Sequence, residues 1–145
     1  MKLVDLNVLL YAVNRDTPHH ESVLAWWEKN LQGDEPVGLA WVVLLGFLRL
    51  ATNGHVFAEP LSCEAAVAHV DRWLDHPGAR LVQETDEHWR VLRSLLDEAG
   101  TAGNLTTDAY LAALAITHGA TLASCDADFA RFRSLKCENP TRCEG

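Results

Sequence analysis

The sequence predicts an α/β fold, a three-layer sandwich around a sheet of four or five mostly parallel strands. Short apolar runs alternate with helical patterns along the chain, which favours parallel strands covered by helices. The strand-like runs are brief and almost wholly apolar, as in strands buried on both faces. Polar residues follow where two of these runs end, and such folds bind ligands at the carboxyl ends of their strands.

The first half of the chain contains two strand patterns and three helix patterns. In order, we predict a strand at 2–4, a helix from Asn7, a helix from Pro18 to Gly33 with Thr17 as its cap, a strand at 37–40, and a helix at 41–53. Gly33 and the pair Asn53-Gly54 are natural stops, since both residue types suit the end of a helix. The third helix is almost entirely apolar, which predicts that it is buried.

The second half repeats the alternation. It reads as a helix at 61–74 capped by Ser62, a strand at 80–83, a helix after Thr85, a loop at 100–104, a helix from 105 to 118, a strand at 120–123 and an edge strand at 135–137. Thr106 or Thr107 is expected to cap the 105–118 helix, and Gly119 to end it. The loop at 100–104 either closes as a lid or only connects two helices.

Five residues within the helices carry further expectations. Trp26 and Trp27 point about 100° apart, so one of them is expected at the edge of the core or in an interface. Arg49 is the only charge on the apolar helix, which predicts an acidic partner for it. Gly46 costs about 1 kcal/mol relative to Ala in a helix, so it serves either close packing or function. Trp89 is expected in the core.

The length of the chain indicates the number of domains, and its net charge indicates which classes of partner it favours. At 145 residues the chain forms one domain, which we place at 1–138 with a loose tail at 139–145. Its net charge of −8 and the lack of a Lys/Arg block do not favour nucleic-acid binding. This observation counts against a nuclease, unless part of the acidity surrounds a metal ion. An acidic surface equally suits a basic protein partner.

The cysteines and the amino-terminal segment indicate a cytoplasmic protein. The four cysteines, at 63, 125, 137 and 143, show neither a CxxC motif nor zinc spacing, so reduced thiols are expected. His19-His20-Glu21 reads as the start of a helix more readily than as a metal cluster. Asp5 and Asn7 interrupt the first apolar run, which is unlike a signal peptide. No stretch has the apolar length of a membrane span.

Three acids lie at the ends of predicted elements. Asp5 follows the first strand, Asp108 lies in the first turn of the 105–118 helix, and Asp126 follows the strand at 120–123. If these two strands are neighbours, the three carboxylates converge and repel unless a cation neutralises them. Oxygen ligands favour Mg²⁺ or Mn²⁺. The alternative is three solvated surface acids, which is the better interpretation of any one of them taken alone.

Four segments together resemble a known family. They are VDLNVLLYA at the start, LGFLRLATN in the middle, TTDAYLAALAITHGATLASCDADFARF, and KCENP near the end. In this order they resemble the PIN-domain nucleases, in particular the VapC-type toxins of bacterial toxin–antitoxin pairs. The likeness covers nearly the whole chain. The third segment is the specific one, with its Asp-Ala helix and its Ser-x-Asp-x-Asp-Phe sequence.

The resemblance implies a metal-dependent endoribonuclease that hydrolyses RNA phosphodiester bonds. It implies Mg²⁺ or Mn²⁺ bound by Asp5, Asp108 and Asp126, with Asn7, Ser124 and Asp128 in supporting positions. It further implies a homodimer and a VapB-type antitoxin, which we expect on an apolar groove near Trp26 or Trp27 and the 41–53 helix. The family usually has Glu where this chain has Gly46, which puts full metal occupancy in question.

Two other protein families are excluded by particular residues. A haloacid-dehalogenase-like phosphatase needs a second Asp where Asn7 stands, and a receiver domain needs a Lys that the stretch from 30 to 135 lacks. The remaining rival is a PIN fold weakened by the loss of Glu at Gly46, acting as a non-catalytic RNA- or protein-binding module. Metal-dependent RNA cleavage separates these two hypotheses.

Overall fold

A computed structural model describes residues 1–142 and confirms the α/β class. One sheet of five strands runs through it, and every pairing is parallel, in the order β3-β2-β1-β4-β5. The strands are β1 (Lys2–Val4), β2 (Val37–Leu39), β3 (Ala79–Leu81), β4 (Thr121–Ala123) and β5 (Cys137–Glu138). The predicted four or five mostly parallel strands are therefore five and fully parallel.

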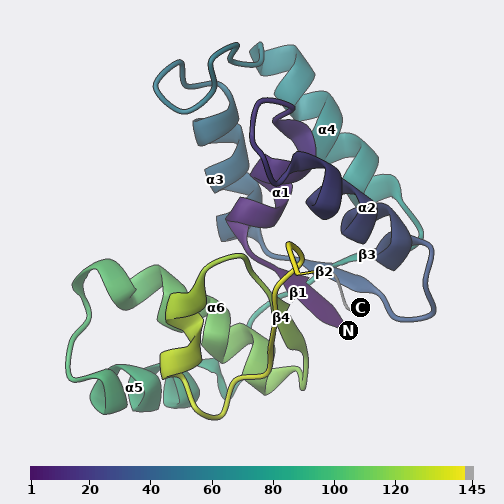
Figure 1. The fold of residues 1–145 in the computed structure, drawn as a ribbon. Coiled ribbons are helices and arrows are strands. Elements are labelled where there is room, and N and C mark those ends of the chain that lie inside the picture. Colours follow the sequence, from purple (N-terminus) through teal and green to yellow (C-terminus); the bar gives the residue numbers. More distant parts are fainter. Residues whose placement is uncertain (143–145) are drawn as a thin grey trace.

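Within residues 1–142, six α-helices cover the two faces of this sheet. They are α1 (Leu6–Val13), α2 (His20–Leu31), α3 (Trp41–Ala51), α4 (Cys63–Asp75), α5 (His88–Ala99) and α6 (Thr106–Thr117), with short 3₁₀ turns η1 (Gly103–Leu105) and η2 (Ala127–Arg131). Helices α1 to α4 gather on one side of the sheet, and α5 and α6 lie on the other (Figure 1). This is the expected three-layer arrangement.

The central strand, β1, joins the two ends of the sequence. It pairs with β4 in a register that sets Val4 beside Ala123, so Asp5 and Ser124 leave the sheet next to each other. The Asp5 N–H continues the ladder by donating to the Ala123 carbonyl over 2.9 Å. The neighbouring strands on which the convergence of the acids depends are therefore present.

Small residues hold α6 close to the sheet. Ala109, Ala112 and Ala113 are fully buried, so the helix packs with little side-chain bulk between it and the strands. Gly119 follows the helix with a φ of 62°, a left-handed conformation that glycine adopts without steric cost. The predicted glycine stop is confirmed, and the following strand begins two residues later. This packing fixes the backbone that carries Asp108.

Gly46 packs against the helix that follows Asp5. A Cβ atom added at Gly46 would lie 2.8 Å from Cδ2 of Leu6, closer than real contacts of that kind. Leu6 is the first residue of α1. Close approach of α3 to α1 therefore favours the packing explanation for this glycine.

The two adjacent tryptophans separate as predicted. Trp27 is 4% exposed and meets Trp73 edge-on, with ring centroids 5.7 Å apart. Trp26 is only half-buried and donates from its indole nitrogen to Glu138 in β5 over 3.1 Å. Trp27 is thus a core residue and cannot line a surface groove, whereas Trp26 lies at the edge of the core.

Several local expectations were wrong. The helices expected to begin after Thr17 and Thr85 start later, at His20 and His88, and α6 has no side-chain cap from Thr106 or Thr107. Trp89 is 64% exposed, because the apolar face of α5 that packs on α6 lies at other positions. Arg49 is exposed and makes no ion pair within residues 1–142. Tertiary packing overrode the local signals in each case.

The end of the described chain forms an ordered turn. The last strand is at Cys137–Glu138, slightly later than the predicted 135–137, and it is an edge strand as expected. In residues 139–142, Asn139 accepts hydrogen bonds from Thr141 and Arg142, and Pro140 is buried. The rest of the predicted tail, 143–145, lies outside the described residues. Among residues 1–142, no helix combines the length and apolar character needed to cross a membrane.

Candidate functional site

Asp5 is fixed at the carboxyl end of the central strand. It caps α1, where its Oδ1 accepts from the Leu6 N–H over 2.7 Å. Its Oδ2 accepts from the Ser124 hydroxyl at 2.7 Å and from the Asn7 side-chain amide at 3.2 Å. The residue is only 9% exposed. Donors on both oxygens hold this carboxylate in one orientation.

Asn7 and Ser124 connect the ends of β1 and β4. The Asn7 amide also donates to Ser124 Oγ over 3.3 Å, and its Oδ1 accepts from the Cys125 N–H over 3.1 Å. Ser124 Oγ in turn accepts from the Asp126 N–H at 3.0 Å. The structure therefore brings Asp5, Asn7, Ser124 and the Asp126 backbone into one hydrogen-bonded network, as their positions at strand ends predicted.

Asp126 and Asp128 form the outer part of this cluster. Asp126 caps the short turn η2, and its Oδ1 accepts from the Asp128 N–H over 2.9 Å. Both residues are exposed, unlike Asp5. Because one carboxylate oxygen of Asp126 is engaged in the cap, its Oδ2 is the oxygen left for a ligand.

Asp108 approaches the same place from the other side of the sheet. It lies in the first turn of α6, where the helix dipole favours a negative charge. Burial raises the pKa of its carboxyl, and the charges of Asp5, Asp126 and Asp128 raise it further, while Arg131 partly opposes them. Asp108 is therefore close enough to Asp5, Asp126 and Asp128 for their negative charges to repel its carboxylate.

The local environment raises the pKa of both Asp5 and the nearby Cys125 thiol, with different consequences. Burial raises the pKa of Asp5, hydrogen bonds from Ser124 and Leu6 oppose that rise, and the Asp126 charge adds to it. Burial and the Asp5 charge raise the pKa of Cys125 to about 11. At neutral pH this thiol stays protonated, so it is not a nucleophile. Within the described chain, Cys63, Cys125 and Cys137 are free thiols.

The donor set fits a hard divalent cation in its chemistry. Its side chains are carboxylates with a hydroxyl and an amide oxygen beside them, the ligand types that Mg²⁺ and Mn²⁺ prefer. Burial raises the pKa of Asp108, repulsion by the other acids raises it further, and a bound cation would favour the charged carboxylate against both effects. Within residues 1–142 no three His, Cys, Asp or Glu side chains are already grouped closely enough to enclose an ion. Water ligands would have to complete the coordination.

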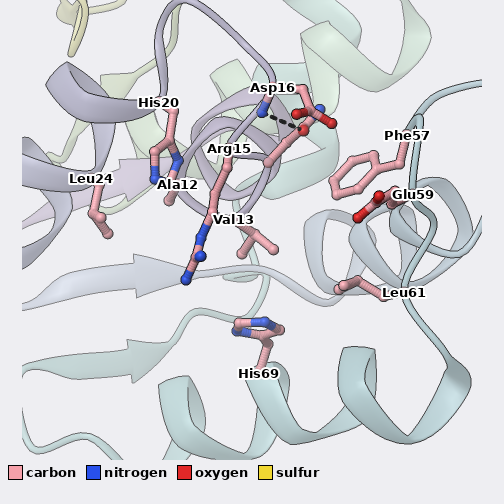
Figure 2. A pocket seen from close by; sticks show the side chains of 11 residues that line it. Ala12, Val13, Arg15, Asp16, His20, Leu24, Phe57, Glu59, Leu61 and His69 are labelled. Carbon is pink, nitrogen blue, oxygen red and sulfur yellow. Dashed lines mark hydrogen bonds between the residues drawn. The ribbon is translucent and has the colours of Figure 1, made fainter.

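A cavity larger than the one that borders Ser124 and Asp126 lies away from these acids. It has a volume of about 490 Å³ and lies among the end of α1, the start of α2, the segment after α3, and α4. Figure 2 shows Arg15 reaching into it between His20 and His69, with Phe57 and Glu59 on another side. Cavity size alone would therefore have misplaced the site, and the hydrogen-bonded acids locate it.

Two cations near the acids were not assigned to the site from the sequence. Arg131 lies close enough to Asp108 to affect its pKa. Arg142 lines a cavity of about 200 Å³ together with Ser124 and Asp126. The only sequence signal for Arg131 is its place just after the acidic segment, and Arg142 lies in the segment that was expected to be a loose tail.

Comparison with protein families and curated proteins gives consistent matches. Residues 2–135 match the model of the PIN domain family. The chain is 48% identical over 140 residues to Ribonuclease VapC37 of Mycobacterium tuberculosis, covering 97% of each chain. It is 43% identical over 142 residues to Ribonuclease VapC33 of the same species, covering 98% of this chain and 99% of the relative.

Solved structures share the fold at low sequence identity. VapBC2 from Rickettsia felis, bound to a promoter DNA fragment, aligns with a TM-score of 0.69 at 20% identity, over 95% of this chain and 97% of that one. FitAcB from Neisseria gonorrhoeae aligns with a TM-score of 0.68 at 22% identity, over 99% and 100%. These alignments support the same arrangement of strands and helices.

Proposed function

This chain belongs to the PIN domain family, and from that premise we propose that it is a metal-dependent endoribonuclease, the toxin of a toxin–antitoxin pair. The observation that carries the proposal is the network that gathers Asp5, Asn7, Ser124 and Asp126 at the ends of β1 and β4, with Asp108 facing it from α6. The curated relatives are named ribonucleases, which agrees with this chemistry.

Each side chain has a distinct role in the proposed site. Asp5, Asp108 and Asp126 hold Mg²⁺ or Mn²⁺, which when bound makes a water more acidic and stabilises charge on the phosphate during in-line displacement. Ser124 and Asn7 orient the Asp5 carboxylate through their hydrogen bonds. Asp128 supports Asp126, because its N–H fixes one oxygen of that carboxylate. Such orientation raises the affinity of metal ligands.

A cleavage assay tests the activity. Purified protein incubated with total cellular RNA should produce discrete fragments with Mn²⁺ or Mg²⁺ and none with EDTA. Asp108→Asn should remove the cutting, and Asp97→Asn, an exposed acid on α5, should leave it unchanged. Equal cutting by wild-type protein and Asp108→Asn would contradict the assignment and indicate a contaminating nuclease.

The rival proposal keeps the fold and removes the activity. A chain with Gly46 in place of the family's usual Glu would then be a non-catalytic binding module. The contact between Gly46 and Leu6 gives this glycine a packing role, which weakens the idea that it marks a lost activity. Intact RNA at every metal concentration, from protein that binds the RNA, would favour the rival.

The proposed antitoxin needs a docking surface. The groove was expected near Trp26 or Trp27, but Trp27 is buried and Trp26 lines a different cavity. We place the antitoxin instead at the cavity of Figure 2, whose apolar lining includes Leu24 and Leu61. Asp16 and Glu59 at this cavity outnumber its one arginine, Arg15, which suits a basic, VapB-type partner. The substitution Leu24→Lys should abolish co-purification with the protein encoded by the adjacent gene, and unchanged co-purification would exclude this surface.

The proposed homodimer has support from the outer face of α3. Trp41 and Leu45 are one helical turn apart and are 49% and 60% exposed. A second copy of the chain covering them would remove this apolar surface from water. Light scattering at micromolar concentration should give a dimer, and Leu45→Glu a monomer. A monomeric wild-type protein would contradict the assembly.

A cytoplasmic location completes the proposal, because RNA and free thiols are both found there.

A further inference from the structure

Positive charge is concentrated next to the acidic site. The chain has 12 Lys and Arg residues against 20 Asp and Glu. In the segment 131–142 this balance is reversed, because the segment contains four Lys and Arg residues and one acid, Glu138. The cations are Arg131, Arg133, Lys136 and Arg142, and all are exposed. A basic strip in an acidic protein needs an explanation beyond solubility.

Two cavities along this strip share a wall. The first, of about 200 Å³, is lined by Ser124 and Asp126 of the candidate site. The second, of about 440 Å³, is lined by Trp26 and Lys29 of α2. Both are lined by Cys137, Glu138 and Arg142. The two cavities therefore adjoin the same three residues, and we call the pair the groove, with the acids at one end, Arg142 between the cavities and Lys29 at the other end.

The floor of this groove is braced internally. Glu138 forms an ion pair with Lys2 over 2.8 Å and accepts from the Trp26 indole over 3.1 Å. The Lys2 ammonium also lies over the Trp26 ring, 5.6 Å from its centroid. Glu138 is thus already satisfied by Lys2 and Trp26. Within residues 1–142, Lys29 and Arg142 form no ion pair and stay available for a ligand.

We propose that this groove carries the RNA strand on one side of the cleavage site, with Arg142 and then Lys29 contacting successive stretches of the phosphate backbone. The inference rests on the proposed ribonuclease function and adds to it the residues that position the substrate. Arg and Lys supply most phosphate contacts in nucleic-acid complexes, and such contacts hold the backbone without reading its sequence.

The charge pattern favours an RNA backbone over a protein segment. The negative acids repel a polyanion, so a strand approaching Asp126 needs cations close by to offset that repulsion. The groove supplies them on the side of β5, and Arg131 adds a further cation near Asp108. A basic partner protein would gain nothing from Lys29 and Arg142.

Binding measurements on matched variants test this proposal. A short fluorescein-labelled single-stranded RNA is titrated with protein in EDTA, so that it is bound without being cut, over a series of salt concentrations. The groove pair Lys29→Gln/Arg142→Gln is compared with the control pair Arg72→Gln/Arg80→Gln, which removes the same charge from α4 and from β3, the opposite edge of the sheet. All four positions are exposed, so the fold is expected to stay intact.

The groove pair should bind about tenfold more weakly at low salt, and the slope of log affinity against log salt should fall by about 1.4, since each single-strand phosphate contact contributes about 0.7. The control pair should change affinity little, and Lys29→Arg/Arg142→Lys should bind like wild type. Equal losses in the groove and control pairs, or no loss in the groove pair, would overturn the proposal.

Cleavage in Mn²⁺ separates this proposal from the ribonuclease function. Wild-type protein that cuts RNA, together with a groove pair that binds as tightly as wild type, would overturn the groove and leave the function standing. Asp108→Asn that binds RNA with the wild-type salt dependence but does not cut it would support both. Wild-type protein that neither binds nor cuts would overturn both.

Discussion

The two sides of the acidic site are built differently. On the side of the sheet, Asp5 is 9% exposed and receives three hydrogen bonds, one of them from Ser124, 119 residues away in sequence. On the side of α6, Asp108 is only partly buried, and its position depends on the packing of its helix. One carboxylate is fixed by a network, and the other by its backbone alone.

This difference suggests how the site tolerates the repulsion between its carboxylates. The fixed carboxylate of Asp5 defines where a cation would bind, because its oxygens cannot turn away without losing Ser124 and Asn7. Within residues 1–142 no hydrogen bond holds the Asp108 carboxylate, so we expect it to turn toward a cation when one is present. Substitutions on the sheet side should therefore reduce both stability and activity. Substitutions at Asp108 should reduce activity only.

The largest effect is expected at Gly46, which supports the sheet side through Leu6. Gly46→Glu places a Cβ atom against Leu6 and a carboxylate in an apolar interface, and Leu6 is the residue whose N–H holds Asp5. We expect a loss of about 2 to 4 kcal/mol in the free energy of unfolding, measured by urea denaturation.

Gly46→Ala is the matched control, because it adds the Cβ atom without the charge. It should cost at most about 1 kcal/mol, because the gain in helix propensity only partly offsets the shift that the Leu6 tip must make. A stable Gly46→Glu protein that binds Mn²⁺ more tightly than wild type would show that this position belongs to the metal site.

The second effect concerns the hydroxyl that links the network. Ser124→Ala removes the donor to Asp5 and the acceptor for the Asp126 N–H. We expect Mn²⁺ affinity and RNA cleavage to fall by about 10- to 100-fold, as for other groups that orient metal ligands. Ser134→Ala, at an exposed position, is the control. Unchanged cleavage by Ser124→Ala would show that the network does not position Asp5.

The positions of the acidic residues on their strands and helix were predictable from the sequence. The strand-Asp-x-Asn start, the Asp-bearing helix and the SCDADF segment placed Asp5, Asp108, Ser124 and Asp126 at element ends, because apolar runs and a glycine stop are local signals. The parallel pairing of β1 with β4 turned these positions into one cluster.

What the sequence did not predict depends on contacts between distant segments. Trp89 has the spacing of a core residue, yet it faces away from the helix on which α5 packs. Arg49 was expected to meet an acid, and its helix face points to solvent. Arg142 borders the site because β5 returns to β4 and brings the 139–142 turn with it. No local pattern carries this information.

The third effect is a test of the mobile carboxylate. Asp108→Asn removes a charge that Asp5, Asp126 and Asp128 repel. Without metal, the melting temperature of Asp108→Asn should equal or exceed that of wild type, although cleavage is lost. A clear fall in the melting temperature would mean that Asp108 stabilises the fold. The contrast between the Asp5 side and the Asp108 side of the site would then be wrong.

The smallest effect is expected in the pH dependence of stability. The pKa values of Asp5 and Asp108 are raised in the folded protein, so the folded state keeps their protons to higher pH than the unfolded chain. Their ionisation therefore costs no stability below the ordinary pKa of 3.8, and stability falls as pH rises from there through the raised values. In urea denaturation with EDTA, Asp108→Asn should show a smaller fall than wild type over this range.

The central claim is that Asp5 and Asp108 hold one divalent cation between a fixed and a mobile side. Calorimetric titration of Mn²⁺ into wild type, Asp5→Asn, Asp108→Asn and the control Asp97→Asn tests it directly. We expect one class of site in the wild type and the control, and a large loss of affinity in each of the other two variants. Unaltered Mn²⁺ affinity in both Asp5→Asn and Asp108→Asn would contradict the assignment.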